Sequence, residues 1–147
     1  MKTLQNFING KSVPSQSGQT QDLINPATGE IFAHSPISNA ADIDAAMNAA
    51  AAAFETWRDS TPGERQKAIN KIADAIENRS EELINIECEN TGKPIAVTRA
   101  EEIGPMLDQI RFFAGAARHL EGRSAAEYFK GHTSFIRREP IGVCAQV

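Results

Sequence analysis

The stretch from Asn90 to Pro94 constrains this fold most, because one helical pattern runs up to it and a longer one leaves it. Upstream, a charged start and an apolar side predict a helix over about residues 81–91. Gly92 ends that helix, since glycine enters the left-handed conformation without a Cβ clash, and Pro94 cannot continue it. The chain therefore has to change direction at this point.

Downstream of Pro94, apolar residues recur at spacings of three and four, which predicts a helix of about five turns. Gly122 is expected to close it. Pro105 lies inside the pattern, where it loses a backbone hydrogen bond and crowds the carbonyl of Glu101, so a kink or a helix restart is expected. The apolar stripe consists of Ile103, Met106, Leu107, Ile110, Phe113, Ala114, Ala117 and Leu120.

Two further helices are predicted between residues 38 and 77. Thr61, Pro62 and Glu64 form the sharpest local signal, with threonine as N-cap, proline at the first helical position and glutamate able to complete a capping box. In the helix that starts after Ser38, Asp42 and its neighbours suit the positive end of the macrodipole. The expected apolar faces are Ile43, Met47, Ala50, Phe54 and Trp57 in the first helix, and Ile69, Ile72, Ala73 and Ile76 in the second.

The first 35 residues are typical of short antiparallel β structure. Asn9-Gly10 separates two short β-prone runs and favours a type I′ hairpin turn, because both residues accept positive φ. Residues 21–24 and 31–34 are expected to form a second strand pair around the turn at 25–30. The fold class is therefore α/β and helix-rich, with β hairpins and an incomplete sheet.

At the other end, a hairpin is predicted from about residue 125 to 139, followed after Pro140 by the nearly apolar run 141–147. Such a run suits a strand covered on both faces. Because no sequence follows to flank that strand, we expect the chain to be the first part of a larger fold.

Composition and charge exclude several classes of function. With 15 basic and 19 acidic residues the net charge is −4, and no long basic run is present, so nucleic-acid binding is not expected. The longest apolar run, 49–54, is far short of a membrane span, and residues 1–6 do not resemble a secretory signal, so a cytoplasmic location is expected. Cys88 and Cys144 lack metal-site spacing and are interpreted as small buried hydrophobes.

No active site emerges from residue spacing. The chain has no glycine fingerprint for a dinucleotide and no phosphate loop. Its histidines, His34, His119 and His132, are scattered over separate elements and are interpreted as surface or boundary residues rather than catalysts. Adjacent glutamates such as Glu81 and Glu82 fall at helix starts, where the dipole explains them better than acid catalysis does.

An ordered series of short motifs nevertheless resembles the opening of the NAD(P)-dependent aldehyde dehydrogenases. The resemblance covers essentially the whole chain, and it depends on the order of the motifs more than on any single one. The motifs are Leu23–Glu30, Ala52–Phe54 with Trp57, Thr61–Arg65, Thr91–Pro94, Arg99–Glu101, Arg111–Ala114 and Arg138–Val143.

The resemblance implies a domain plan and a chemistry. Residues 1–122 would be the N-terminal part of the cofactor-binding domain, 123–140 the first hairpin of the oligomerisation domain, and 141–147 the first part of a cofactor-domain strand, with the catalytic domain absent. The family oxidises aldehydes to carboxylic acids through a cysteine thiolate, NAD or NADP as hydride acceptor, and a glutamate base. Those residues would lie beyond residue 147, so no catalytic or cofactor-binding residue is assigned here, and Cys144 is not the nucleophile.

The resemblance also implies one site within this chain and a set of partners. A monovalent cation would be held by the backbone carbonyls of Leu23 and Ile24 and by the side chain at Asn90, where the family has an acid. Hard cations prefer charged oxygens, so the amide would weaken the site; a helix-end asparagine without a ligand is the alternative. The complete protein would be a homo-oligomer, and the motif forms lean towards aminobutyraldehyde or betaine aldehyde substrates.

Two hypotheses of function follow. In the first, the chain is a non-catalytic N-terminal part of an aldehyde dehydrogenase, inactive alone and without bound NAD or NADP. In the second, it is a non-enzymatic interaction partner of a full-length aldehyde dehydrogenase, pairing through the 125–139 hairpin, since exposed strand edges invite pairing.

Overall fold

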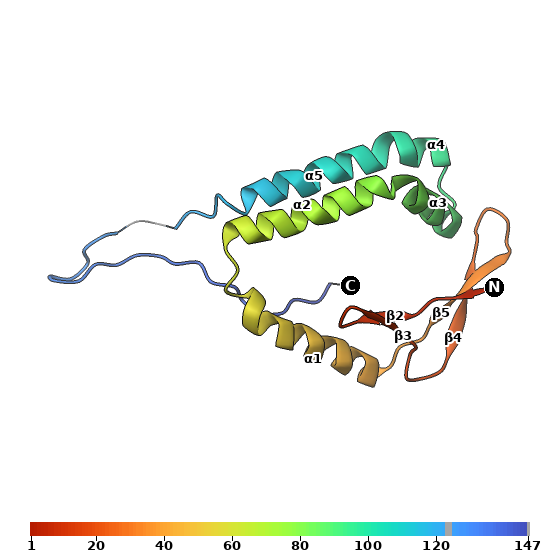
Figure 1. Ribbon diagram of the computed structural model, residues 1–147, viewed down its shortest axis with the longest axis horizontal. Helices are drawn as coiled ribbons and strands as arrows, with labels where there is room; N and C mark the ends of the chain where they lie inside the picture. The colour runs from red at the N-terminus through yellow and green to blue at the C-terminus, as the bar shows by residue number, and fades with distance from the viewer. Residues whose placement is uncertain (123–124, 147) are drawn as a thin grey trace.

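The computed structural model describes residues 1–122 and 125–146, and it contains two small β-sheets followed by a series of helices (Figure 1). The predicted α/β class, helix-rich with an incomplete sheet, is confirmed. The strands are β1 (Lys2–Thr3), β2 (Asn6–Ile8), β3 (Lys11–Val13), β4 (Thr20–Ile24) and β5 (Ile31–Pro36). The helices are α1 (Ala40–Trp57), α2 (Pro62–Asn78), α3 (Ser80–Thr91), α4 (Ile95–Val97) and α5 (Ile103–Ala116), with a π-helical turn at Thr98–Glu102.

Both predicted hairpins of the first 35 residues are present. β2 and β3 pair antiparallel around Asn9 and Gly10, whose φ angles of 50° and 74° match a type I′ turn. β4 and β5 pair antiparallel around the turn at 25–30. The pairing of β1 parallel to β5 was not predicted, because a two-residue strand carries no periodic signal.

Helix α1 begins at a buried carboxylate. Asn39 is the N-cap, and Asp42 completes a capping box by accepting from the Asn39 backbone N–H at 2.9 Å. Asp42 also accepts from the Ser15 hydroxyl at 3.0 Å and the Gln16 backbone N–H at 3.0 Å. The hydrogen bonds from the backbone of Asn39 and then Gln16 lower the pKa of Asp42. One side chain thus joins the loop after β3 to the start of α1.

Helix α2 begins as the sequence predicts. Glu64 accepts from the Thr61 backbone N–H at 2.7 Å, and the Thr61 hydroxyl accepts from the Glu64 backbone N–H at 3.3 Å. These two bonds satisfy backbone donors that a helix start would otherwise leave without a partner.

Replacing this cap gives a first testable prediction. Thr61→Ala should lower the free energy of unfolding by about 1 kcal/mol, because it removes the acceptor for the Glu64 backbone N–H. Thr56→Ala is the matched control, since its exposed hydroxyl donates only to the Ala53 carbonyl inside α1, and it should change stability by less than about 0.5 kcal/mol. Urea titration followed by far-UV circular dichroism measures both; equal losses would contradict the capping role.

The proline inside the long helical pattern is accommodated without a break in the chain's helical course. The π-helical turn at Thr98–Glu102 lies immediately before α5, and it contains Glu101, the residue whose carbonyl Pro105 would crowd. The predicted restart is therefore seen as a change of helix type. The helix ends at Ala116 rather than near Gly122, so the predicted C-terminal end was wrong, and Leu120 lies exposed beyond it.

The buried core of the described residues is small and lies mainly among the later helices. α2 and α5 lie side by side (Figure 1), and Ala73 and Ala114, one on each helix, have no exposed surface. Arg111 on α5 also reaches α2, with distances of 2.8 Å to Asp74 and 2.6 Å to Glu77. Ile84 and Thr98 are the largest fully buried side chains.

Several predicted core residues are instead exposed. Ile43, Met47 and Trp57 on α1 and Ile72 on α2 all retain at least about two fifths of their surface. The helical pattern correctly identified apolar faces, but the described residues do not cover them.

Residues 125–146 form an extended arm that leaves the helices and returns beside α1 (Figure 1). Two antiparallel hydrogen bonds of 3.0 and 2.9 Å join Ala126 and Ser134, so the predicted 125–139 hairpin is present as a single bridge. Residues 141–146 form no strand with any described residue, and Ile141 is 94% exposed. The predicted strand at 141–147 stays a prediction; residues 123, 124 and 147 lie outside the described residues.

No described helix is long and apolar enough to span a bilayer.

Candidate functional site

The carboxyl end of α3 meets the β4–β5 turn, and this corner holds the features that the sequence singled out. Gly92 ends α3 with φ of 75° and donates its backbone N–H to the Cys88 carbonyl at 2.9 Å. A Cβ at Gly92 would lie 2.9 Å from the Pro26 Cγ atom of the turn. The two segments therefore approach closely enough that only glycine fits.

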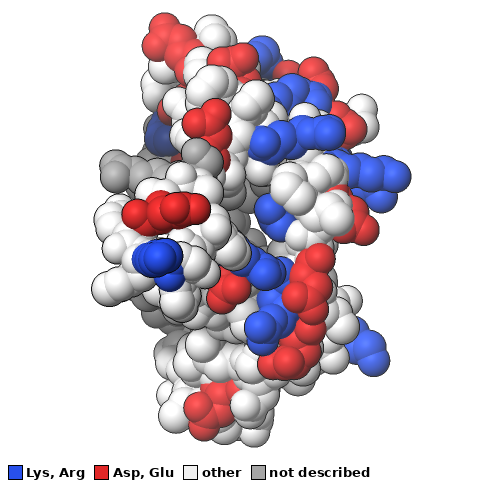
Figure 2. Space-filling view, turned by 90° about the vertical axis from the view of Figure 1, so that its left-hand side faces the viewer, with Lys and Arg blue, Asp and Glu red and all other residues white. Residues whose placement is uncertain are grey.

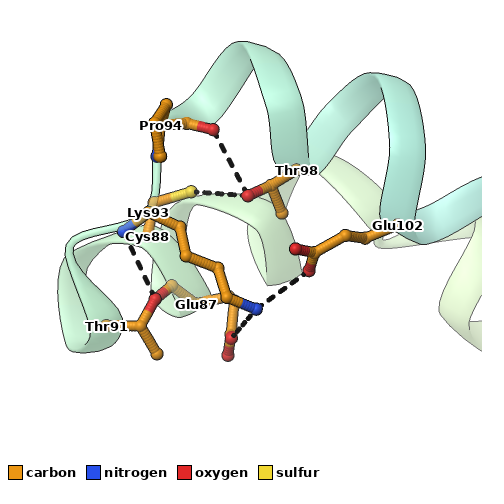
Figure 3. A network of polar contacts seen from close by, with 7 residues as sticks. All are labelled: Glu87, Cys88, Thr91, Lys93, Pro94, Thr98 and Glu102. Atoms are coloured by element: carbon orange, nitrogen blue, oxygen red, sulfur yellow. Dashed lines mark hydrogen bonds and ion pairs between the residues drawn. The ribbon is translucent and has the colours of Figure 1, made fainter.

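The corner is held by a short buried network around Cys88 (Figure 3). The Cys88 thiol donates to the Thr98 hydroxyl at 3.5 Å, and that hydroxyl donates to the Pro94 carbonyl at 3.3 Å. Both Cys88 and Thr98 are buried, which confirms the packing interpretation of Cys88. Cys144 is exposed, so the same interpretation was wrong for it in this structure, because residues 141–146 are uncovered.

Lys93 joins two helical segments at the same corner through ion pairs. Its Nζ atom lies 3.1 Å from the Glu87 carboxylate on α3 and 3.1 Å from the Glu102 carboxylate in the π-helical turn (Figure 3). The bond to Glu87, followed by the bond to Glu102, raises the pKa of Lys93 above its ordinary value. Lys93 is therefore a paired ammonium rather than a free catalytic base.

A cavity of about 460 Å³ opens between the turn and the end of α3. Glu89 and Asn85, one helical turn apart on α3, line it together with Asn25 of the turn. Asn85 Nδ2 donates to the Glu81 carbonyl at 2.8 Å. The remaining lining residues are Ala27, Cys88, Gly92, Lys93 and Ile95. The cavity offers amide and carboxylate oxygens, which are the ligands hard cations prefer.

The predicted cation residues lie around this corner without lining the cavity. Leu23 and Ile24 end β4 just before Asn25, and Asn90 follows Glu89 on α3. Asn90 is exposed and points from a different side of the helix than Glu89, because consecutive helical residues are about 100° apart. The sequence analysis did not identify Glu89 as a residue of this cavity. The available signal was its spacing of four residues from Asn85, which places both side chains on one face of α3. Among the described residues, no group of three or more His, Cys, Asp or Glu side chains is placed to hold a metal.

A second hollow, of about 600 Å³, lies between the end of α1, the start of α2 and the returning arm. Its wall carries Trp57 and four arginines, and the Arg58 guanidinium lies 5.5 Å from the centre of the Phe54 ring. Asp59 and Glu139 also line it. The four arginines of this hollow are Arg58, Arg65, Arg137 and Arg138.

Basic and acidic side chains are interspersed over the face of the molecule that Figure 2 shows. No surface of a single charge sign, of the kind that nucleic acid requires, is seen on that face.

The histidines remain apart, as predicted. His34 lies 2.8 Å from Asp22 in a cross-strand pair of β4 and β5. His119 follows α5 and His132 lies in the turn of the arm. Among the described residues, none of the three histidines is hydrogen-bonded to a serine, threonine or cysteine side chain. The geometry therefore supports no hydrolytic triad there.

Comparison with known proteins gives consistent matches along the chain. The sequence model described as "Aldehyde dehydrogenase family" matches residues 12–147. DhaS of Bacillus subtilis (strain 168), whose name assigns it to the aldehyde dehydrogenases, is 37% identical over 146 residues, which cover 96% of this chain and 29% of DhaS.

Solved structures give the same result for the backbone. An NAD+ complex of an aldehyde dehydrogenase from Bacillus cereus is 34% identical, with a TM-score of 0.88 over 95% of this chain and 29% of that one. An NAD-dependent aldehyde dehydrogenase from Sinorhizobium meliloti is 40% identical, with a TM-score of 0.77 over 84% of this chain and 25% of that one. The chain thus spans less than a third of the length of these relatives.

Proposed function

The chain belongs to the aldehyde dehydrogenase family, and from this premise we propose that it forms the first part of an enzyme that oxidises an aldehyde to a carboxylic acid with NAD or NADP. The family match over residues 12–147 is the observation that carries this proposal. The NAD+ bound to the relative from Bacillus cereus supports the choice of cofactor.

The proposal assigns no nicotinamide-binding site to the described residues, because their sequence contains no glycine-rich phosphate loop. The cofactor would accept the hydride in the complete enzyme, and no step of that reaction is assigned to a residue of this chain. The 147-residue chain is therefore inactive by itself in this proposal.

A chimera tests the function directly. The segment of DhaS that this chain matches is replaced by the chain itself, and aldehyde oxidation is followed by the formation of NADH or NADPH. We expect turnover from the chimera and none from the chain alone. A folded chimera without turnover, or cofactor-dependent turnover by the chain alone, would contradict the proposal. Aminobutyraldehyde and betaine aldehyde belong in the substrate panel, because the form of the motif Thr91–Pro94 leans towards those substrates.

A monovalent cation site at the α3 corner is part of the proposal. The backbone carbonyls of Leu23 and Ile24 and the side-chain oxygen of Asn90 are its ligands, supported by the close contact between the β4–β5 turn and the end of α3. Because Asn90 is neutral, the site binds K+ or Na+ weakly.

Restoring a charge at Asn90 should strengthen this site. A carboxylate about 4 Å from a monovalent cation contributes ~1 kcal/mol in water and ~4 kcal/mol near a protein surface. Asn90→Asp should therefore bind K+ about tenfold more tightly or better, seen as a larger rise of the melting temperature with KCl than with choline chloride. Asn78→Asp, at the end of α2, is the matched control with the same charge change. If both variants respond to KCl alike, the site is not at Asn90.

The domain plan is proposed on the same basis. Residues 1–122 form the start of the cofactor-binding domain, 123–140 the first hairpin of the oligomerisation domain of a homo-oligomer, and 141–147 the first part of a cofactor-domain strand. The bridge between Ala126 and Ser134 supports the hairpin.

A cytoplasmic location is proposed because Cys88 and Cys144 are both free thiols. The non-enzymatic alternative, in which the chain is a partner of a full-length aldehyde dehydrogenase, is not favoured by the comparisons, which align the chain with the enzymes themselves.

A further inference from the structure

The turn between β2 and β3 carries a reactive dipeptide. Asn9 and Gly10 are both exposed, and no other asparagine of the sequence is followed by glycine. Asparagine is a thermally labile residue type, because the backbone nitrogen of the next residue is able to attack its side-chain amide carbon. Glycine hinders that attack least, since it has no Cβ. The dipeptide therefore has a chemistry of its own besides its role in the turn.

This chemistry converts the asparagine amide into a carboxylate. The Gly10 nitrogen bonds to Asn9 Cγ, the Cγ–Nδ2 bond breaks, and Nδ2 leaves as ammonia with the proton that the Gly10 nitrogen has lost. The product is a five-membered succinimide ring. One water then opens the ring at either of its carbonyls, which gives aspartate or, when the main chain is left running through Cγ, isoaspartate. Water is the only co-reactant.

The closed hairpin holds the two reacting atoms apart. Ile8 pairs with Lys11, and the φ angles of Asn9 and Gly10 are 50° and 74°, as in a type I′ turn. The first central residue of such a turn has ψ of about +30°. At that ψ, the Asn9 Cβ and the Gly10 nitrogen lie on nearly opposite sides of the Cα–C bond, whereas the ring needs them on the same side. Reacting atoms have to approach to about 3–3.5 Å, so the closed turn is unreactive.

Opening of the hairpin removes this protection. β2 and β3 form a sheet of their own with two strands, and a two-stranded hairpin is only marginally stable. Such hairpins form within about 1–10 μs, far faster than the covalent step. The rate of the reaction therefore follows the fraction of molecules in which the turn is open. No hydrogen bond of the Gly10 N–H is seen among the described residues, so the backbone angles alone protect the dipeptide.

We propose that Asn9 is a self-modifying site, which deamidates through a succinimide with Gly10 whenever the β2–β3 hairpin opens. The modification locks the hairpin open, because isoaspartate adds one methylene group to the main chain and a two-residue turn tolerates no change of loop length. The hairpin is tied to the segment before α1 by the Ser38 hydroxyl, which donates to Asn6 Oδ1 at 3.0 Å. Modification at Asn9 thus loosens the packing of β2 beside α1.

This site is independent of aldehyde oxidation. Asn9 and Gly10 lie outside residues 12–147, which the family model matches. The reaction takes place within one turn and needs no residue from elsewhere in the chain. The proposal therefore goes beyond the proposed function, and an inactive chimera would leave it untouched.

Ageing of the purified 147-residue chain tests the proposal. The chain is incubated at one pH and temperature, in buffer and in guanidinium chloride, and the chymotryptic peptide that begins at Ile8 is followed by mass spectrometry. We expect the exchange of NH2 for OH at Asn9, with isoaspartate among the products, and one added negative charge on a chain of net charge −4. The reaction should be at least about tenfold faster in guanidinium chloride, because only the open fraction of the folded chain reacts. Asn48 is the internal control: it is exposed within α1 and followed by Ala49, and it should stay unmodified in buffer.

Variants separate the chemistry from the hairpin. Asn9→Gly keeps a dipeptide that favours the type I′ turn but has no side-chain amide, so its peptide should not change. Lys11→Pro leaves Asn9 and Gly10 in place but removes the backbone donor opposite Ile8, which opens the turn. In buffer it should deamidate at least about tenfold faster than the matched Lys11→Ala, which loses the same charge and keeps the donor.

Three results would overturn the proposal. Equal rates in buffer and in guanidinium chloride would mean that the hairpin does not protect Asn9. A Lys11→Pro variant that ages no faster than Lys11→Ala would have the same meaning. A modified peptide from Asn9→Gly would place the reaction at another residue.

Discussion

Gly92→Ala is expected to lower the free energy of unfolding by about 2–4 kcal/mol, the sum of a backbone and a steric effect. An alanine at φ of 75° costs about 1 kcal/mol or more, because its Cβ crowds the following carbonyl. Its Cβ would also lie 2.9 Å from Pro26 Cγ, and overpacking of this kind costs about 1–3 kcal/mol. Pro26 is a rigid ring in a short turn, so relief requires the turn to move.

The Gly29→Ala variant separates the two contributions. Gly29 has φ of 76°, nearly the same as Gly92, but nothing lies within 4 Å of the position its Cβ would take. It should lose only the backbone part, about 1 kcal/mol. Urea titrations of both variants give the difference, which measures the contact between the β4–β5 turn and α3. Equal losses would mean that the turn moves freely and that the corner is not held closed at Gly92.

The second large effect is expected from Ile84→Ala, at about 2–5 kcal/mol. Ile84 is 2% exposed and, with Thr98, is one of the largest fully buried side chains of the described residues. Removing its three outer carbons loses their transfer free energy and leaves a cavity. Because so few large side chains are buried, the rest of the core offers little to compensate.

Ile86→Ala provides the comparison for Ile84→Ala on the same helix. Ile86 is 50% exposed, so the same chemical change should cost at most about 1 kcal/mol. Thermal unfolding followed by circular dichroism measures both variants. If Ile86→Ala proves as costly as Ile84→Ala, α3 is packed on the opposite face from the one the structure shows.

The features that sequence alone predicted are those decided within a few residues. Asn9-Gly10 fixes a type I′ turn and Thr61 with Glu64 fixes a helix start, because the partners of each hydrogen bond or dihedral preference are adjacent in the chain. Gly92 is a similar case, since its left-handed conformation follows from the end of α3 itself. Family membership came from the order of such local motifs, and the comparisons confirm it.

Contacts between distant segments were not predictable in this way. Asp42 looked like a residue that suits the helix dipole, but Ser15 and Gln16, far upstream, make it a buried acceptor. The helical spacing placed Phe113 on an apolar face, yet periodicity says nothing about what covers that face. At the candidate site, the motif directed attention to Asn90, whereas the cavity is lined by its neighbour Glu89. One step along a helix was enough to change which oxygen faces the cavity.

The exposed apolar side chains of α1 and α5, among them Trp57 at 51%, Phe112 at 67% and Phe113 at 63% exposure, also matter for how the longer relatives are made. Synthesis proceeds at about 5–20 residues per second, so a relative of which this segment is 29% needs on the order of tens of seconds to complete the remainder. During that interval Phe112, Phe113 and Trp57 would be exposed to solvent. Ribosome-associated chaperones that bind apolar side chains should therefore recognise α1 and α5 first in nascent chains of this family.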